Sequence, residues 1–243
     1  MSDKISILSV EIPIMSKAEA AERMSRFLDE PRGAKIFTPN PQMLLAAKKD
    51  PSCSELLSSA DLLLPDGIGI KIASHIKKKP IPERLAGIDM AYGLLEAAEK
   101  RGLSVYLLGG KPTVAERAAE ELKKKLPKLK VCGTHHGYFD RQSEENTAVV
   151  RSVKEAAPDI LFVCFGASTQ ERWICENIAS LPSVRIAMGL GGSLDVWSGN
   201  AKRAPRLVQA LCLEWLWRAS REPKRLKIFI EIPQFLYFSI RER

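Results

Sequence analysis

The chain has 243 residues, 45% of them hydrophobic, so it can bury the core of one large domain or two small ones and is not expected to be disordered. The formal net charge is +8, which suggests an anionic partner such as nucleic acid, a phosphorylated metabolite or anionic lipid. Residues 201–243 hold ten Lys/Arg and four Asp/Glu, so this tail alone carries +6 of the +8.

Cysteine usage and the N-terminus indicate the compartment. The five cysteines are scattered and form no C-x-x-C pair, which favours a reducing cytosol and argues against a zinc site. In the first fifteen residues, Glu11 and Pro13 interrupt the apolar run, so a strand is predicted rather than a signal peptide. No run approaches the roughly 20 apolar residues that a membrane-spanning helix needs. We therefore expect a cytoplasmic protein.

Strand and helix patterns alternate along residues 1–200. Short β-branched or aliphatic runs predict strands at 34–38, 61–65, 104–110, 130–136, 159–166 and 185–192. Amphipathic patterns predict helices at about 17–29, 41–49, 86–101, 112–126, 144–157 and 169–180. This order predicts an α/β fold, with a Rossmann-like, mostly parallel sheet and helices on both faces, as a catalytic core spanning residues 1–200.

The character of the chain changes after Gly199. Leu207, Leu211 and Trp215 recur every four residues, which predicts one helix with a single apolar stripe that ends before Pro223. A second apolar segment, 228–240, is too short to cross a bilayer but suits an amphipathic segment lying in the membrane interface, beside basic residues. Residues 201–243 are thus predicted to be a helical, basic C-terminal appendage.

Polar residues and glycines follow the predicted strands. Ligands of parallel α/β sheets gather beyond the carboxyl ends of the strands, so these residues are the candidate site. They are Thr38, Asn40, Asp66, Gly67, Gly109, Tyr138, Gln170, Gly191, Gly192 and Asp195.

Asp66 is the candidate general base. It directly follows an apolar strand and precedes glycines that permit close approach of a ligand. Partial burial would raise the pKa of such a carboxyl toward the working pH. A helix N-cap in a tight turn explains the same residue equally well, and the local sequence leaves both interpretations open.

The other candidates also have plain structural explanations. Thr38 and Asn40 could hold substrate hydroxyls, although turn chemistry explains them at least as well. Paired glycines after strands, at 109–110 and 191–192, suit backbone amides aimed at a diphosphate. Neither pair matches a dinucleotide or ATP fingerprint. Arginines are the preferred donors to phosphate, but a solvated basic face is the alternative for those of the tail.

Six motifs in unbroken order resemble the bacterial WecB/TagA/CpsF glycosyltransferases, glycosyltransferase family 26, over about residues 5–238. They are "TPNPQMLLAA", "ADLLLPDGIGI", "ERLAGIDM", "GTHHGYF", "LFVCFGASTQERW" and "GLGGSLDVWSGNAKRAPRLVQALCLEWLWRASREPKRL". The chain is most similar to the teichoic-acid branch. That branch transfers N-acetylmannosamine from its UDP donor to undecaprenyl-diphospho-N-acetylglucosamine.

The resemblance implies an inverting transfer that needs no metal ion or other cofactor. Asp66 matches the base that deprotonates the 4-hydroxyl of the acceptor. Thr38, Asn40 and Gln170 match positions that line the sugar pocket. Uridine and diphosphate would be received by Tyr138, by Asp195 and by the glycine turns, which include Gly67, Leu108, Gly109, Gly191 and Gly192. Phosphate contacts are implied for Arg84, Arg218 and Arg225.

The same resemblance implies partners and a location. The partners would be a UDP-sugar, an undecaprenyl-diphosphate-linked acceptor and the inner face of the cell membrane, which the appendage would meet as a lid over the site. Exposed apolar residues of the tail could drive self-association away from the membrane. Relatives use other UDP-hexoses or UDP-N-acetylmannosaminuronate, so the donor stays open.

Two other hypotheses compete with the transferase, one of them an enzyme of a different class and the other a binding module. A nicotinamide-dependent dehydrogenase would have a similar sheet but would carry the fingerprint that is missing here. A nucleic-acid or lipid-binding module would explain the aromatic and basic tail without any chemistry. The ordered motifs favour the transferase, and no nucleic acid is expected as a partner.

Overall fold

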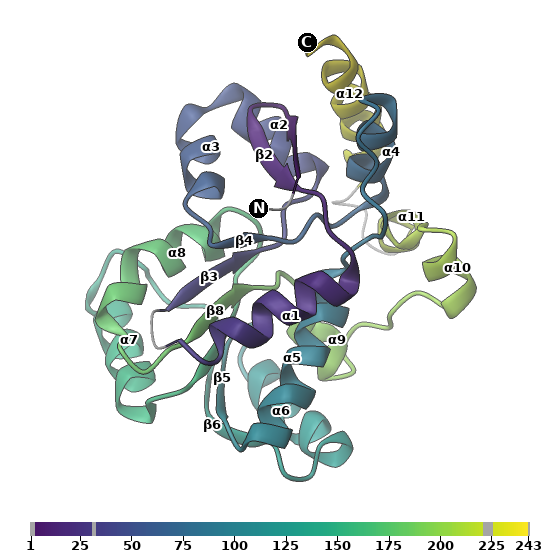
Figure 1. Cartoon of the computed structure of the whole chain (residues 1–243). Helices are drawn as coiled ribbons and strands as arrows, with labels where there is room; N and C mark the ends of the chain where they lie inside the picture. The colour runs from purple at the N-terminus through teal and green to yellow at the C-terminus, as the bar shows by residue number, and fades with distance from the viewer. Residues whose placement is uncertain (1–2, 31–32, 221–225, 243) are drawn as a thin grey trace.

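A six-stranded parallel sheet forms the centre of the molecule. The computed structural model describes residues 3–30, 33–220 and 226–242, without the side chains of Ala210 and Arg218. The strand order is β4-β3-β8-β7-β5-β6 and every pair is parallel (Figure 1). The strands are β3 (Ala34–Phe37), β4 (Leu62–Leu63), β5 (Ser104–Gly109), β6 (Lys130–His135), β7 (Ile160–Cys164) and β8 (Ile186–Gly189). The predicted α/β fold is confirmed.

Successive residues of the strands enter two different apolar clusters, because side chains alternate across a sheet. Ile36 belongs to one cluster and Phe37 to the other, and Leu107 and Leu108 divide in the same way. Helices cover both faces, as predicted. The first cluster includes residues of α1 (Lys17–Phe27), α5 (Gly87–Arg101), α6 (Val114–Lys125) and α9 (Ser193–Trp197).

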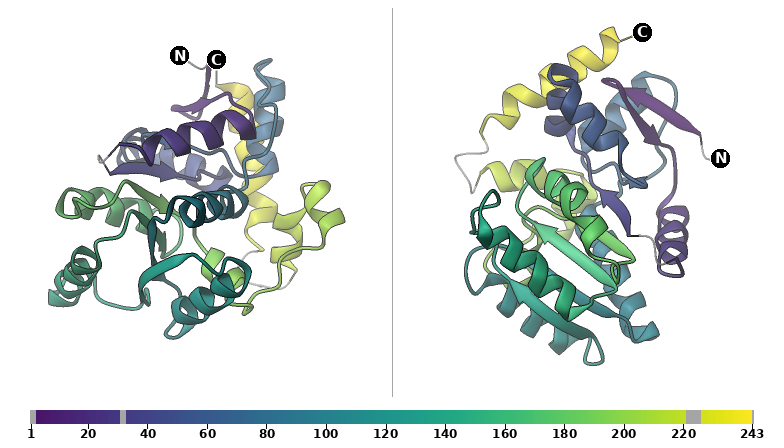
Figure 2. Two further views of the ribbon diagram at one scale, coloured as in Figure 1. Left: turned by 60° about the horizontal axis from the view of Figure 1, so that its bottom comes forward. Right: turned by 90° about the vertical axis from the view of Figure 1, so that its left-hand side faces the viewer.

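The second cluster lies on the opposite face of the sheet (Figure 2). It includes residues of α2 (Pro41–Lys49), α3 (Pro51–Ser58), α4 (Ile68–Ile76), α7 (Glu144–Ala156), α8 (Thr169–Asn177) and α12 (Ile228–Arg241). A short 3-10 turn, Ile178–Ser180, continues α8. The first residues form not one strand but an antiparallel hairpin, β1 (Lys4–Ile7) with β2 (Val10–Pro13). Leu8 and Ser9 turn it with positive φ.

Helices α3, α4 and the short α9 were not predicted. Helix α3 begins where the Asp50 side chain accepts a hydrogen bond from the Ser52 amide, with Pro51 at its first position. Helix α4 has the sequence IGIKIASHI, whose glycine and β-branched residues do not favour a helix. Its Ile70 and Ala73 are buried in the second cluster, so tertiary packing overrides the local preference.

The first part of the appendage differs from the prediction. The single helix expected through Leu207, Leu211 and Trp215 is wrong: the chain forms two short helices, α10 (Arg206–Ala210) and α11 (Glu214–Ala219). They are separated at Cys212, which has a φ of 58°. Leu207 and Leu211 are 79% and 68% exposed, so the apolar stripe that they form in the sequence buries little against the core.

Helix α12 runs along α2 and α4 (Figures 1 and 2). Phe235 is fully buried there, and a Cβ added to Gly69 of α4 would lie 3.5 Å from the Phe235 ring. Ser239, one turn further, is also buried. The last part of the appendage is therefore packed on the core, beside the carboxyl ends of β3 and β4.

Candidate active site

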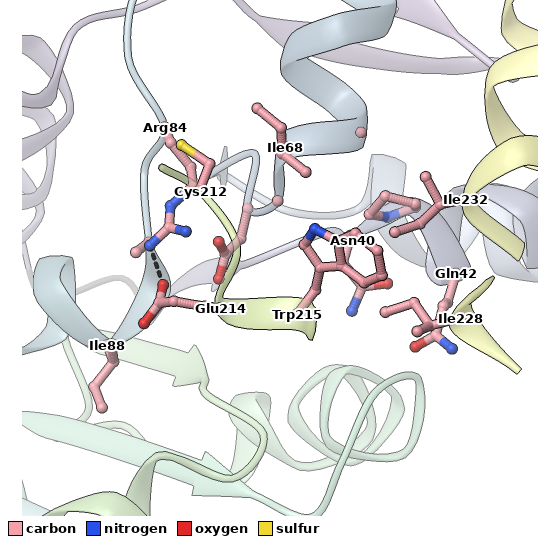
Figure 3. Close-up of a pocket in the computed structure, with 15 residues that line it drawn as sticks. Asn40, Gln42, Ile68, Arg84, Ile88, Cys212, Glu214, Trp215, Ile228 and Ile232 are labelled. Carbon is pink, nitrogen blue, oxygen red and sulfur yellow. Dashed lines mark hydrogen bonds and ion pairs between the residues drawn. The ribbon is translucent and has the colours of Figure 1, made fainter. Parts of the chain in front are cut away.

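A pocket of about 150 Å³ lies where the loops after β3 and β4 meet the appendage (Figure 3). The core supplies Asn40, Gln42, Asp66, Gly67 and Arg84, among others. The appendage supplies Cys212, Glu214, Trp215, Ile228 and Ile232. Polar groups of the core thus face a wall of the appendage that is partly apolar.

Asp66 lies in this pocket and is half-buried. Its amide donates a hydrogen bond of 2.9 Å to the Pro39 carbonyl, which fixes the loop after β4. Its Oδ2 accepts a bond of 3.4 Å from the amide of Gly87, the first residue of α5. The N-cap of the helix that follows Asp66 is Gly67, with no side-chain cap. The carboxylate therefore meets the positive end of a different helix, which favours its charged form.

Arg84 lies in the loop that leads to α5 and forms an ion pair with Glu214 of α11. The two side chains are 13% and 14% exposed. Burial alone would lower the pKa of Arg84, but the carboxylates of Asp66 and Glu214 together raise it above its ordinary value. The guanidinium is thus held charged beside Asp66, within reach of an anionic ligand.

Asn40 and Gly67 line the pocket, and each also has a structural role. The Asn40 Oδ1 accepts a bond of 3.1 Å from the Met43 amide and so caps α2. Gly67 has a φ of 108°, which a residue with a side chain rarely adopts. Both therefore shape the loops that carry Asp66 and the pocket wall.

Thr38 and Gln170 form a second group next to the pocket. Thr38 Oγ1 donates to the Gly189 carbonyl at 3.2 Å. Gln170 is only 3% exposed and its Oε1 accepts a bond of 2.8 Å from the Gly191 amide. A Cβ on Gly87 would lie 2.8 Å from Thr38 Cγ2, so this group adjoins the amide that binds Asp66. These side chains hold the turn after β8 in place.

Gln170 is in turn held by Glu171, whose side chain is fully buried. Gln170 Nε2 donates to Glu171 Oε1 at 2.8 Å, while Glu171 Oε2 has no hydrogen-bond partner among the described residues. Burial raises the pKa of the Glu171 carboxyl above its ordinary value. No local sequence pattern explains the burial of this carboxyl.

The loops after β5 and β6 form a third group, apart from the pocket. The Gly137 amide donates to the Gly110 carbonyl at 2.8 Å, which joins the two loops. A Cβ on Gly109 would lie 2.4 Å from the Cys164 carbonyl oxygen, so the backbone needs glycine there. Leu108 is fully buried, and its side chain packs in the core. Tyr138, in the loop after β6, is 66% exposed.

The remaining predicted residues follow β8 or belong to the tail. Gly191 and Gly192 lead into α9, where Asp195 is half-buried in the first turn. None of the three lines the pocket. Position 218 falls within α11, but the Arg218 side chain is not described, and Arg225 lies outside the described residues.

The sequence prediction missed Glu214 and Trp215, because only the arginines of the tail were considered. A usable signal was present, since Glu214 is the single acidic residue between positions 201 and 220. The arginines of the tail were considered only as donors to phosphate, so the bonds of Arg203 to Asp89 and Glu214 were not predicted. That pairing joins residues far apart in the sequence, and no local pattern reveals it.

Residues 3–30, 33–220 and 226–242 contain no group of three or more His, Cys, Asp or Glu side chains arranged to hold a metal ion. None of the helices in those ranges combines the length and apolar character needed to cross a bilayer.

The fold and the pocket define the class: an α/β protein with a carboxylate and an arginine placed for an anionic ligand beyond the strand ends. Comparison with known proteins agrees. Residues 5–243 match the model of the "Glycosyl transferase WecG/TagA/CpsF family". The chain belongs to this family of glycosyltransferases, which confirms the resemblance found in the sequence motifs.

Named relatives cover most of the chain. A Bacillus subtilis (strain 168) protein is 35% identical over 216 residues, 89% of this chain and 82% of the relative. A Staphylococcus aureus (strain MW2) protein is 33% identical over 236 residues, 96% of this chain and 91% of the relative. Both bear the name N-acetylglucosaminyldiphosphoundecaprenol N-acetyl-beta-D-mannosaminyltransferase.

Proposed function

We propose that this protein transfers N-acetylmannosamine from UDP-N-acetylmannosamine to undecaprenyl-diphospho-N-acetylglucosamine, with a β-1,4 linkage, in the synthesis of the teichoic acid linkage unit. The names and coverage of the relatives support the donor and acceptor. The observation that carries the proposal is the position of Asp66, which lies in a pocket beside Arg84 and under the appendage.

The chemistry needs one base and a site for the leaving group. The Asp66 carboxylate takes the proton of the acceptor 4-hydroxyl as that oxygen attacks the anomeric carbon of the donor. The bond from the anomeric carbon to the diphosphate oxygen breaks, and UDP departs with the bonding electrons. Attack from the face opposite the diphosphate inverts the configuration. Asp66 suits this role because it is half-buried in the pocket, near the charge of Arg84, rather than enclosed in the core.

Charge on the departing diphosphate is met by arginine rather than by a divalent ion in this proposal. Arg84 is held charged inside the pocket, and fixed donors of this kind are worth about 3–4 kcal/mol each when removed. Arg218 and Arg225 are proposed to add further contacts from the appendage. Transfer that persists undiminished in excess EDTA supports this, whereas activity restored only by Mg²⁺ or Mn²⁺ contradicts it.

The acceptor is lipid-linked, and we propose that the appendage meets the membrane surface on the cytoplasmic side. It exposes large apolar side chains next to basic residues, a combination that suits anionic lipid. The exposed apolar residues are Leu207, Leu211, Leu216, Leu226, Phe229, Ile230, Tyr237 and Ile240. Sedimentation with anionic vesicles, but not with neutral ones, is the expected result.

The proposed transfer is tested with a panel of UDP-sugars and a short-chain lipid-diphospho-N-acetylglucosamine acceptor. Formation of the disaccharide lipid from UDP-N-acetylmannosamine alone is expected. Faster transfer from another UDP-hexose or from UDP-N-acetylmannosaminuronate would assign the chain to a different branch of the family. No product with any donor would reject the transferase role.

A further inference from the structure

An acidic side chain of the appendage occupies the most cationic part of the pocket. Glu214 Oε2 is paired with Arg84 Nη2, and Glu214 Oε1 accepts a bond of 3.2 Å from Arg203 Nε. The carboxylate therefore contacts two guanidinium groups, one from the core and one from the start of the appendage. Figure 3 shows its pairing with Arg84. Two guanidiniums around two anionic oxygens is also the arrangement that binds phosphate.

The charges around Glu214 leave little room for a second anion. Arg84 and Arg203 supply two positive charges and Lys17 adds a third near Asp89, whereas Asp66, Asp89 and Glu214 supply three negative ones. With Glu214 in place the cluster is neutral, and without it the cluster carries a net charge of +1. A diphosphate is therefore attracted only by the second arrangement.

Trp215, the next residue, brings a hydrogen-bond donor that is not used. Its indole Nε1 is buried and has no hydrogen-bond partner among the described residues. The ring lines the pocket and lies edge-on to Phe229 with the centroids 5.5 Å apart. Figure 3 shows the indole nitrogen on the side of the ring nearer to Ile68. A buried N–H without a partner costs free energy, and an anionic ligand oxygen would relieve that cost.

The helix that carries both residues is weakly anchored. Helix α11 has six residues, and Leu216 within it is 38% exposed, as Leu207 and Leu211 before it are exposed. Segments with few buried apolar contacts move at low cost. The Glu214 carboxylate can therefore leave the two arginines without unfolding the core.

We propose that a substrate diphosphate binds at Arg84, Arg203 and the Trp215 indole N–H, and that it does so by displacing the Glu214 carboxylate, which fills this anion site when the site has no ligand. The assignment of the ligand as a diphosphate rests on the proposed function. Glu214 then acts as an internal competitor, and the appendage rearranges only when a diphosphate takes its place.

The test is binding of inorganic pyrophosphate to the full-length chain, measured by calorimetry. Glu214→Gln removes the competing charge, so we expect affinity to rise about tenfold, equivalent to about 1.4 kcal/mol. Trp215→Phe keeps the ring and removes the N–H, so affinity should fall about tenfold. The matched control is Glu242→Gln, which alters an acid of the same appendage that pairs with Lys77, and neither of these residues lines the pocket. It should leave affinity unchanged.

Several outcomes overturn the inference. Suppose that Glu214→Gln folds but binds pyrophosphate no tighter than the unaltered chain. Glu214 then only joins the appendage to the core through its ion pairs and does not compete with the ligand. If that variant does not fold, Trp215→Phe decides alone, and unchanged affinity rejects the site. Pyrophosphate binding needs no sugar transfer. If the chain lacks transferase activity but Glu214→Gln binds pyrophosphate more tightly, the proposed function is rejected and this inference stands. If transfer is normal and neither variant changes pyrophosphate affinity, only this inference is rejected.

Discussion

Arg203 holds Asp89 through two parallel hydrogen bonds, Nη1 to Oδ1 at 2.6 Å and Nη2 to Oδ2 at 2.7 Å. Asp89 lies in the first turn of α5, and Arg203 is at the start of the appendage. The pair therefore ties the appendage to the helix whose first amide binds Asp66. Paired contacts of this kind fix orientation as well as distance.

Asp89→Asn should destabilise the chain near neutral pH and have less effect in acid. Burial would raise the pKa of Asp89, but the hydrogen bonds and charge of Arg203 lower it below the ordinary 3.8. The contribution is therefore complete above 3.8 and is lost as the pH falls through the lowered value. Because the side chain is 38% exposed, we expect a loss of at most about 1 kcal/mol.

Urea denaturation at neutral and acidic pH measures this difference. Glu22→Gln is the control, since Glu22 pairs with Arg26 where both side chains are 65% exposed, and no change is expected. An Asp89→Asn variant as stable as the unaltered chain at neutral pH would show that the pair has no net effect on folding.

Glu171→Gln should stabilise the chain near neutral pH. Burial raises the pKa of Glu171 above 4.5, so between 4.5 and the folded value the folded chain keeps a proton that the unfolded chain releases. Stability therefore falls as the pH rises through that window. Gln cannot ionise and can still accept the bond from Gln170, so we expect a gain of about 1 kcal/mol near neutral pH.

The gain should disappear in acid, where the carboxyl is protonated in both states. Thermal unfolding of the two proteins across the acid range measures it. A Glu171→Gln variant that is less stable at neutral pH would mean that the native site requires the charged carboxylate.

Phe235→Ala tests whether α12 is docked on the core in solution. Phe235 is fully buried between α12 and α4, and removal of a buried Phe side chain costs about 3–5 kcal/mol. Tyr237→Ala, on the same helix and 48% exposed, should cost far less. Equal melting temperatures for the two variants would contradict the packing of α12.

The sequence predicted most of the sheet because its strands are buried on both faces and stand out as apolar runs. The strand before Asp66 marked that residue as a candidate, whereas Arg84, in the loop between α4 and α5, was named only through the family resemblance. The sequence did not predict α4, whose composition disfavours a helix, or the break at Cys212, which interrupts a regular apolar spacing. Both depend on contacts between distant segments, as does the pairing of Glu214 with Arg84.

The resemblance implied separate roles for Asp66 as base and Arg84 as a phosphate contact, but it did not predict which side chains share the pocket with them. The resemblance gave residue roles for a ligand-bound site, whereas the structure has an appendage carboxylate in contact with the arginine. Thr38 and Gln170 hold the turn after β8, and Tyr138 lies exposed in the loop after β6. A sequence pattern names the residues but does not give the distances between them.

The central claim is that Asp66 removes the acceptor proton. It is tested most directly by single-turnover transfer of N-acetylmannosamine to the lipid acceptor with Asp66→Asn, beside Asp29→Asn as an exposed control. We predict that Asp66→Asn slows transfer by about 10²–10⁴-fold while UDP-N-acetylmannosamine binds with unchanged affinity. Transfer by Asp66→Asn at the rate of the control would contradict the account.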